Sequence, residues 1–144
     1  MRGARCILYV EDDPDHAELV LRCLERSNAR QGAVHVADGE LALAYLRACV
    51  RGECPRPELV LLDLRLPKVD GVEVLREVKG SEELRDIPVV VLTTSTRPAD
   101  VGQAYALHAN SYLVKPDGLE RLVAMIDALA AYWLRWNRPP PSAG

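Results

Sequence analysis

Short apolar runs and segments of helical periodicity alternate five times along the chain. In the helical segments, apolar residues recur at intervals of three and four, the spacing that buries one face of a helix. The apolar runs cover residues 6–10, 33–36, 59–62, 89–92 and 112–114, and the helical segments cover 14–27, 39–50, 98–107 and 118–136, with another beginning near Gly71. Strand and helix therefore alternate, which is typical of a parallel sheet with helices on both faces.

Local signals add detail to this pattern. The run 59–62 is uniformly apolar and predicts a central strand, whereas the segment 51–58 contains a Gly and two Pro and predicts a loop. Asp13 is suited to cap the first helix, and we place Val50 and Leu119 on the buried faces of the second and fifth helices. A chain of 144 residues is long enough for one domain with its own core. The sequence thus predicts a single doubly wound α/β domain.

Composition narrows the class of protein. The net charge is −3, so no basic field favours non-specific binding to nucleic acid. No apolar run approaches the length of a membrane span, and residues 1–5 lead into a strand rather than into a signal-peptide core. The four cysteines form no Cys-x-x-Cys pair and are expected to be reduced thiols. We therefore expect a cytoplasmic protein that binds neither nucleic acid nor membrane.

Polar side chains follow four of the apolar runs directly. Glu11 and Asp12 follow the first run, Asp63 the third, Thr93 the fourth and Lys115 the fifth. In an open parallel sheet, ligands bind outside the carboxyl ends of the strands. Carboxylates, a hydroxyl and an ammonium suit a divalent cation and a phosphoryl group. Each residue alone has an ordinary explanation as a cap, turn or solvent-exposed group, so the prediction rests on their occurring together.

The chemistry that these groups support centres on Asp63. A carboxylate at the end of a central strand can act as a nucleophile and form an acyl phosphate. That step needs neutralisation of the phosphoryl oxygens, and Mg²⁺ held by Glu11 and Asp12 would supply it. Lys115 would contact the phosphoryl oxygens as a point charge, and Thr93 would donate a hydrogen bond to one of them.

At this point the sequence resembles the receiver domains of bacterial two-component response regulators, over about residues 5–136. Pro67 and Gly71, four and eight residues after Asp63, fit the loop of that family. The resemblance implies a flavodoxin-like fold of five parallel strands in the order 2-1-3-4-5, with a receiver domain at 1–137 and a Pro-rich tail at 138–144. It also implies a phosphoacceptor signalling protein rather than an enzyme. Such a protein accepts a phosphoryl group on Asp63 from a histidine kinase and assists its own phosphotransfer and dephosphorylation.

The resemblance also implies a ligand set for the metal. Asp12 and Asp63 would bind Mg²⁺ directly, together with the backbone carbonyl oxygen of Arg65. Glu11 would act mainly through water.

A conformational switch is implied as well. Phosphorylation would draw Thr93 toward the phosphate, and Tyr112 would rotate inward into the space that Thr93 leaves. The change would appear on the face made by the fourth helix, the fifth strand and the fifth helix. The Lys115–Pro116 peptide bond is expected to be cis, as in similar proteins.

A narrower resemblance is carried by segments 92–95, 107–112 and 132–134. They are similar to stand-alone receivers that partner phytochrome-type histidine kinases, which implies a bacteriophytochrome as a partner. Arg65 departs from the pattern, because similar proteins often carry Asn two residues after the phosphoacceptor. Ser95 stands two residues after Thr93. Both side chains border the path of the hydrolytic water in the family, so the dephosphorylation rate stays open.

The output of the domain is less marked in the sequence. No DNA-binding pattern follows the fifth helix, so the chain signals through protein contacts or serves as a phosphate sink or shuttle. The fifth helix carries a second apolar row away from its core stripe: Met125, Ala128, Tyr132 and Trp136. The favoured interpretation is a homodimer through the helix-four, strand-five and helix-five face. The alternative is a terminal helix whose aromatic residues fold over the edge of the domain.

Two further interpretations are weaker. An Asp-nucleophile phosphatase similar to haloacid dehalogenases would carry a second Asp two residues after Asp63, where this chain has Arg65. A degenerate receiver would have lost Asp63, Lys115 or the acidic pair, and all are present. The three histidines lie on separate elements without ligand spacing, and we expect surface or packing roles for them: His16, His35 and His108.

Overall fold

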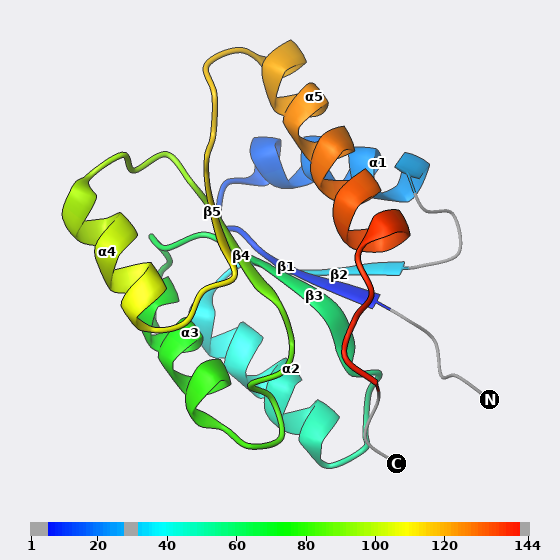
Figure 1. Ribbon diagram of the computed structural model, residues 1–144, viewed down its shortest axis with the longest axis vertical. Helices are drawn as coiled ribbons and strands as arrows, with labels where there is room; N and C mark the ends of the chain where they lie inside the picture. Colours follow the sequence, from blue (N-terminus) through cyan, green and yellow to red (C-terminus); the bar gives the residue numbers. More distant parts are fainter. Residues whose placement is uncertain (1–5, 28–31, 142–144) are drawn as a thin grey trace.

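The computed structural model describes residues 6–27 and 32–141 of the chain. The expectations for residues 1–5 and for the last residues of the Pro-rich tail, 142–144, lie outside this part. Five parallel strands form one sheet in the order β2-β1-β3-β4-β5, with helices on both faces (Figure 1). The predicted doubly wound flavodoxin-like fold is confirmed.

The elements follow one another as strand and helix throughout. The strands are β1 (Cys6–Val10), β2 (Gly32–Val36), β3 (Pro57–Leu62), β4 (Val89–Thr93) and β5 (Ser111–Val114). The helices are α1 (Pro14–Ser27), α2 (Gly39–Val50), α3 (Gly71–Gly80), α4 (Pro98–Ala106) and α5 (Leu119–Ala130), followed by a π-helical turn, η1 (Ala131–Trp136). Within the described residues, no helix is both long and apolar enough to cross a membrane.

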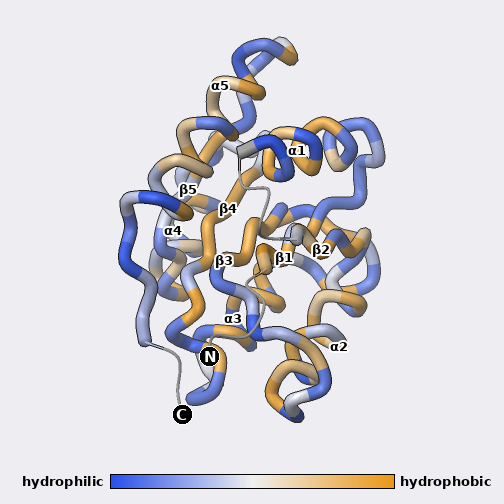
Figure 2. Tube along the Cα trace, turned by 90° about the vertical axis from the view of Figure 1, so that its right-hand side faces the viewer, coloured by the Kyte–Doolittle hydropathy of each residue, from blue (hydrophilic) through white to orange (hydrophobic). Residues whose placement is uncertain are grey.

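Successive residues of the strands point to opposite faces of the sheet and pack into two separate hydrophobic cores. One face of the sheet packs against α1 and α5, with Tyr9, Leu61 and Leu92 among its strand residues. The other face packs against α2, α3 and α4, with Leu62 and Val91 among its strand residues. The inner strands are therefore apolar along most of their length, apart from Glu58 near the start of β3 and Thr93 at the end of β4, as expected of parallel strands covered on both faces (Figure 2).

Aspartates cap three of the helices. The Asp13 side chain accepts hydrogen bonds from the backbone N–H groups of Asp15 and His16, which confirms it as the cap of α1. At the start of α2 the Asp38 side chain accepts from the Leu41 N–H, and at the start of α3 the Asp70 side chain accepts from the N–H of the next residue, Gly71. Each cap pairs backbone donors that the first helical turn leaves without a partner.

Three local expectations are wrong. Val50 is 46% exposed and Leu119 is 65% exposed. Val50 is the last residue of α2 and Leu119 the first of α5, and these end turns extend past the sheet, so apolar spacing does not bury them there. The expected loop at 51–58 ends early, because β3 begins at Pro57 and pairs with Cys6 of β1.

Candidate functional site

The register of the two central strands brings Glu11 and Asp63 together. Val10 pairs with Leu62 across β1 and β3, and the backbone N–H of Asp63 donates to the Val10 carbonyl at 3.1 Å. The next residue on each strand therefore lies at the same carboxyl edge of the sheet. Both residues are nearly inaccessible, with 1% of Glu11 and 8% of Asp63 exposed.

Three carboxylates converge at this edge. Glu11, Asp12 and Asp63 each offer an oxygen, and these oxygens lie within 4.8 Å of one another. Asp12 is the exposed member of the group. Oxygen ligands of this kind, two of them largely removed from water, fit a hard divalent cation such as Mg²⁺. The expected acidic cluster is therefore present as an arrangement of side chains.

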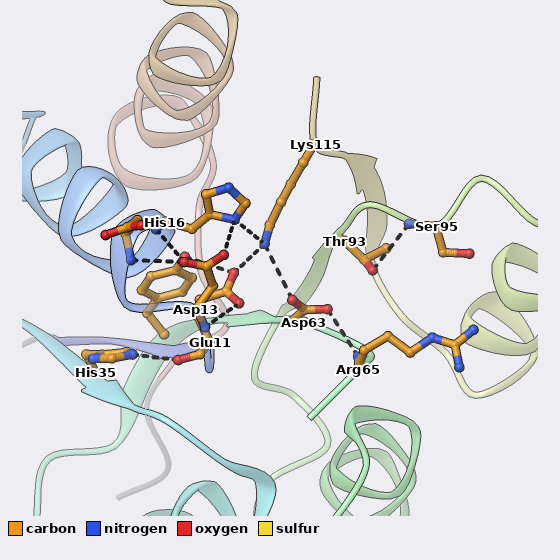
Figure 3. Close-up of polar contacts among 11 residues, drawn as sticks. Glu11, Asp13, His16, His35, Asp63, Arg65, Thr93, Ser95 and Lys115 are labelled. Carbon is orange, nitrogen blue, oxygen red and sulfur yellow. Dashed lines mark hydrogen bonds and ion pairs between the residues drawn. The ribbon is translucent and has the colours of Figure 1, made fainter. Parts of the chain in front are cut away.

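Lys115 reaches into the same cluster from the end of β5. Its Nζ donates to Glu11 Oε1, to Asp63 Oδ2 at 3.4 Å and to His16 Nδ1 at 3.2 Å (Figure 3). Its side chain is only 5% exposed. One ammonium among three carboxylates leaves an excess of negative charge, which a divalent cation would balance.

The backbone at Lys115 differs from the expectation. Its N–H donates to the Thr93 carbonyl at 2.7 Å and so continues the pairing of β4 with β5. The Lys115–Pro116 bond is trans, so the expected cis bond is wrong. The intrinsic preference of a prolyl bond is for trans, and the lysine reaches both carboxylates in that isomer.

Glu11 is held by a set of neighbours beneath the cluster. Tyr9 donates its hydroxyl to Glu11 Oε1 at 3.4 Å, and the Asp13 N–H donates to Oε2 at 3.2 Å. His35 Nε2 lies 2.8 Å from the Glu11 carbonyl oxygen, and its ring lies tilted against the Tyr9 ring, with the ring centroids 5.6 Å apart. Burial raises the pKa of Glu11, and the hydrogen bond from Lys115 opposes that rise. Burial likewise raises the pKa of Tyr9.

His16 and His35 therefore contact residues of the site. From the sequence, only surface or packing roles were expected for them, because their spacing is not that of ligands. His16 lies in the first turn of α1, and its Nδ1 reaches Lys115 from there, a contact for which the spacing along the chain gives no signal. His35 lies near the carboxyl end of β2, which pairs with β1. His108 is exposed, as expected, just after the end of α4.

The loop after Asp63 depends on a glycine. The N–H of Gly71 donates to the Leu64 carbonyl at 3.0 Å. A Cβ atom at Gly71 would lie 2.1 Å from the carbonyl oxygen of Asp63, far inside any normal contact. Glycine therefore lets the start of α3 approach the end of β3 closely, and this approach shapes the loop that carries Arg65.

The backbone of Arg65 lies at the site, whereas its side chain points away and pairs with a residue of α4. Its N–H donates to Asp63 Oδ1 at 3.1 Å, which places the Arg65 backbone at the rim of the acidic cluster. Its guanidinium points away from Lys115 (Figure 3) and pairs with Asp100 Oδ2 at 3.2 Å. Asp100 also accepts from the Ser95 hydroxyl, which holds the pKa of that carboxyl below its usual value. Asp100 gave no signal in the sequence.

Thr93 and Tyr112 lie on the β4–β5 side of the site. Thr93 is fully buried, and its Oγ1 lies 3.5 Å from the N–H of Ser95. The Tyr112 ring is half-buried, and its hydroxyl donates to the Ser95 carbonyl at 2.9 Å. Both side chains thus contact the short segment that joins β4 to α4.

The remaining predicted residues lie away from this edge. The row on the C-terminal helix consists of Met125, which packs half-buried on the α1–α5 core, and the exposed Ala128, Tyr132 and Trp136. Tyr132 is 54% exposed and Trp136 is 75% exposed. The structure therefore brings together Glu11, Asp12, Asp63, Thr93 and Lys115 and leaves the row outside the site.

Known proteins are similar to this chain in sequence and in fold. The response regulator receiver domain family matches residues 7–127. A probable methanogenesis regulatory protein, FilR2 of Methanothrix harundinacea, is 51% identical over 95% of this chain and 88% of its own length. The response regulator Rcp1 of Synechocystis is 44% identical over 90% of this chain and 89% of its own length.

Solved structures agree with these relatives. Rcp1 in its Mn²⁺-bound form superposes with a TM-score of 0.89 and 42% identity, covering 94% of this chain and 99% of Rcp1. The phosphorylated cyanobacterial phytochrome response regulator RcpA superposes with a TM-score of 0.91 and 38% identity, covering 96% of this chain and all of RcpA. The chain belongs to the response regulator receiver domain family, and its close homologues include the response regulator Rcp1 and the cyanobacterial phytochrome response regulator RcpA.

Proposed function

We propose that this chain is a cytoplasmic single-domain response regulator that accepts a phosphoryl group on Asp63 from a histidine kinase. One observation carries the proposal. The Asp63 carboxylate lies 3.4 Å from the Lys115 ammonium and within 4.8 Å of carboxylate oxygens of Glu11 and Asp12. A nucleophile, a phosphoryl-binding cation and a metal-binding pair therefore share one edge of the sheet.

The transfer is a displacement at phosphorus. A carboxylate oxygen of Asp63 attacks, the new O–P bond forms as the N–P bond of a phosphohistidine breaks, and the kinase imidazole leaves. Lys115 stabilises the charge on the phosphoryl oxygens, and this electrostatic term is the main contribution that a protein makes to such a step. Mg²⁺, held by Asp12, Asp63 and the Arg65 carbonyl and by Glu11 through water, would neutralise those oxygens further.

The kinase that we propose is a bacteriophytochrome, because Rcp1 and RcpA are close homologues and RcpA is described as a phytochrome response regulator. We expect phosphoryl transfer from an autophosphorylated kinase of this type when Mg²⁺ is present and none after chelation with EDTA. A histidine kinase of another class should transfer at least about tenfold more slowly. Labelled kinase and regulator are separated on a gel over time.

The outcomes of that experiment separate the two parts of the proposal. Equal rates from both kinases would contradict the phytochrome partnership and leave the phosphoacceptor function in place. Transfer that is unaffected by EDTA would contradict the metal site.

We propose that Thr93 and Tyr112 form the switch. Once Asp63 is phosphorylated, the Thr93 hydroxyl donates to a phosphoryl oxygen, and Tyr112 turns into the space beside it. That rotation breaks the hydrogen bond from Tyr112 to the Ser95 carbonyl. The segment between β4 and α4 is then free to change, and a pre-existing equilibrium shifts toward the active form.

Beryllofluoride, which mimics a phosphoryl group on a carboxylate, tests the switch. With Mg²⁺ it should bury the Tyr112 ring, and NMR spectra of ring-labelled tyrosine should show a large shift of the Tyr112 resonances. Tyr45 on α2 lies outside the switch face and serves as the internal control. Shifts around Asp63 with an unchanged Tyr112 would rule the mechanism out.

We propose that the output is a homodimer through the face of α4, β5 and α5. Trp133 packs half-buried against the α1–α5 core, whereas Tyr132 and Trp136 remain exposed. Tyr132 meets Trp133 edge to face, with ring centroids 5.2 Å apart. Of the terminal aromatic residues, Trp133 packs against the domain, as the alternative interpretation of a folded-over terminal helix expects. Tyr132 and Trp136 are exposed and are available to contact a second copy of the chain.

Light scattering of the parent and of a Tyr132→Ser, Trp136→Ser double variant tests the dimer. The parent should have twice the monomer mass at high micromolar concentration, and the variant should be a monomer. Leu41→Ser removes a side chain of α2 that is 49% exposed and outside this face, so it should leave the dimer intact. A parent protein that stays monomeric both with and without beryllofluoride would contradict the proposed dimer.

A further inference from the structure

Three of the four cysteines gather at the amino end of the sheet, opposite the acidic cluster. Cys6 begins β1, Cys49 lies in the last turn of α2, and Cys54 lies in the turn that leads to β3. This turn is found at the lower edge of Figure 1. The Sγ atoms of Cys49 and Cys54 are 3.1 Å apart, although both cysteines are free thiols.

The backbone turn between these two cysteines sets their approach. The Glu53 N–H donates to the Ala48 carbonyl at 2.9 Å, and the Gly52 N–H donates to the Cys49 carbonyl at 3.0 Å. Gly52 has φ +77, which a residue with a side chain rarely adopts. Together these bonds form a Schellman motif, which ends α2 and turns the chain back on itself. Cys54 is thereby returned to the side of the helix that carries Cys49.

Side-chain contacts hold the two thiols in place. The Cys49 thiol donates to the Pro55 carbonyl at 3.2 Å, and the Cys54 thiol donates to the Tyr45 carbonyl at 3.4 Å. Both residues are partly exposed, whereas Cys6 is 5% and Cys23 is 3% exposed. A small oxidant in solution therefore reaches Cys49 and Cys54 more readily than the other two cysteines.

We propose that Cys49 and Cys54 form an oxidation site that a low-molecular-weight disulfide, such as oxidised glutathione, converts into an intramolecular disulfide. The separation of the sulfurs is only about 1 Å longer than the covalent bond of about 2.05 Å. Closing that gap needs no rearrangement of α2 or β3, because the Schellman turn already sets the two side chains side by side.

The reaction proceeds as two exchanges. The Cys54 sulfur attacks oxidised glutathione as a thiolate, forming a mixed disulfide and releasing one glutathione thiolate. The Cys49 sulfur then attacks the Cys54 sulfur of that mixed disulfide and releases the second glutathione. The two protons of the protein thiols end on the two released glutathiones, so the protein loses two electrons and the oxidant gains them. Burial and the neighbouring Cys54 raise the pKa of the Cys49 thiol. The same two exchanges give the same linkage when the Cys49 sulfur attacks first.

The site is independent of the chemistry at Asp63. The hydrogen bonds of both thiols go to groups at the amino end of the sheet, and β3 separates them from the phosphoryl site. Phosphorylation should therefore proceed in the reduced and the oxidised forms, and failure of one proposal does not affect the other.

The test equilibrates the full chain with glutathione buffers of increasing oxidising strength, alkylates the remaining thiols and digests without reduction. Trypsin cleaves after Arg51, so Cys49 and Cys54 fall on separate peptides, 48–51 and 52–65, and Cys6 and Cys23 fall on two others. Mass spectrometry then distinguishes every pairing. We expect the linked pair 48–51 with 52–65 to form under buffers in which Cys6 and Cys23 are still alkylated.

Variants and denaturant complete the test. Cys49→Ser should stop at a glutathione adduct on Cys54, and Cys23→Ser should leave the linkage unchanged. In denaturant, the equilibrium constant for the linkage should fall by at least about tenfold, because the native turn aligns the sulfurs. Linkage through Cys6, disulfides between chains, or a parent that accumulates the glutathione adduct without linkage would each overturn the proposal.

Discussion

Asp63→Asn is expected to take up no phosphoryl group when the protein is incubated with Mg²⁺ and a small phosphodonor such as acetyl phosphate. The amide has the shape of the carboxylate but lacks its nucleophilic charge, so the displacement at phosphorus cannot begin. The fold should survive, because the amide oxygen can still accept from the Arg65 N–H, a bond of 3.1 Å in the parent. Intact-mass spectrometry measures the uptake, which should be one group for each parent chain.

Asp13→Asn provides the matched control. Asp13 lies in the same loop as the acidic pair, but its side chain caps α1 through bonds to Asp15 and His16. Asparagine caps a helix about as well as aspartate, so this variant should be phosphorylated like the parent. Labelling of Asp63→Asn to the level of the parent would refute the assignment.

Lys115→Met is expected to destabilise the metal-free protein by about 3 kcal/mol, the lower end of the range for removing one partner of a buried ion pair. Methionine keeps the length of the side chain but leaves Glu11 and Asp63 without their cation. Those two side chains are 1% and 11% exposed, so water compensates little. Urea unfolding of parent and variant in EDTA measures the difference, and excess Mg²⁺ should recover much of it by supplying another cation.

The loss of folding stability caused by Lys115→Met should also become smaller as the pH falls. Burial already raises the pKa of Glu11, and the hydrogen bond and charge of Lys115 are the largest influences that oppose this rise. Without the lysine, the folded protein binds a proton at Glu11 that the unfolded chain releases, so stability relative to the parent falls as pH increases. Lys68→Met is the control, because Lys68 is 62% exposed and its ion pairs are long. Equal stability of Lys115→Met and parent in EDTA at neutral pH would contradict this account.

The sequence predicted the sheet because its signals are local. Apolar runs such as 59–62 and caps such as Asp13 act within a few residues, and the strand order followed from the family resemblance. Val50 and Leu119 were misplaced because periodicity marks a helix face but not where the helix leaves the sheet. The first residue of β3, Pro57, was missed because proline also signals a turn, and only pairing with β1 decides between them.

The site was predictable where the fold itself places the residues. Glu11, Asp63 and Lys115 are brought together by strand ends, which any parallel sheet aligns at one edge. The contacts of His16 with Lys115 and of Asp100 with Arg65 depend on side chains that reach between distant elements. Spacing along the chain carries no signal for such contacts. The sequence did not predict that Cys49 and Cys54 lie close together for a related reason. Their proximity depends on the Schellman turn after α2, which reverses the direction of the chain between them.

The most direct measurement is the position of the phosphoryl group itself. The parent is phosphorylated with acetyl phosphate and Mg²⁺ and then treated with hydroxylamine, which converts an aspartyl phosphate into a stable hydroxamate on the same residue. Peptide mapping should find one hydroxamate, on Asp63, and none in an EDTA control. A hydroxamate on Glu11 or Asp12, or a phosphorylated chain without any hydroxamate, would contradict the proposal that Asp63 is the phosphoacceptor.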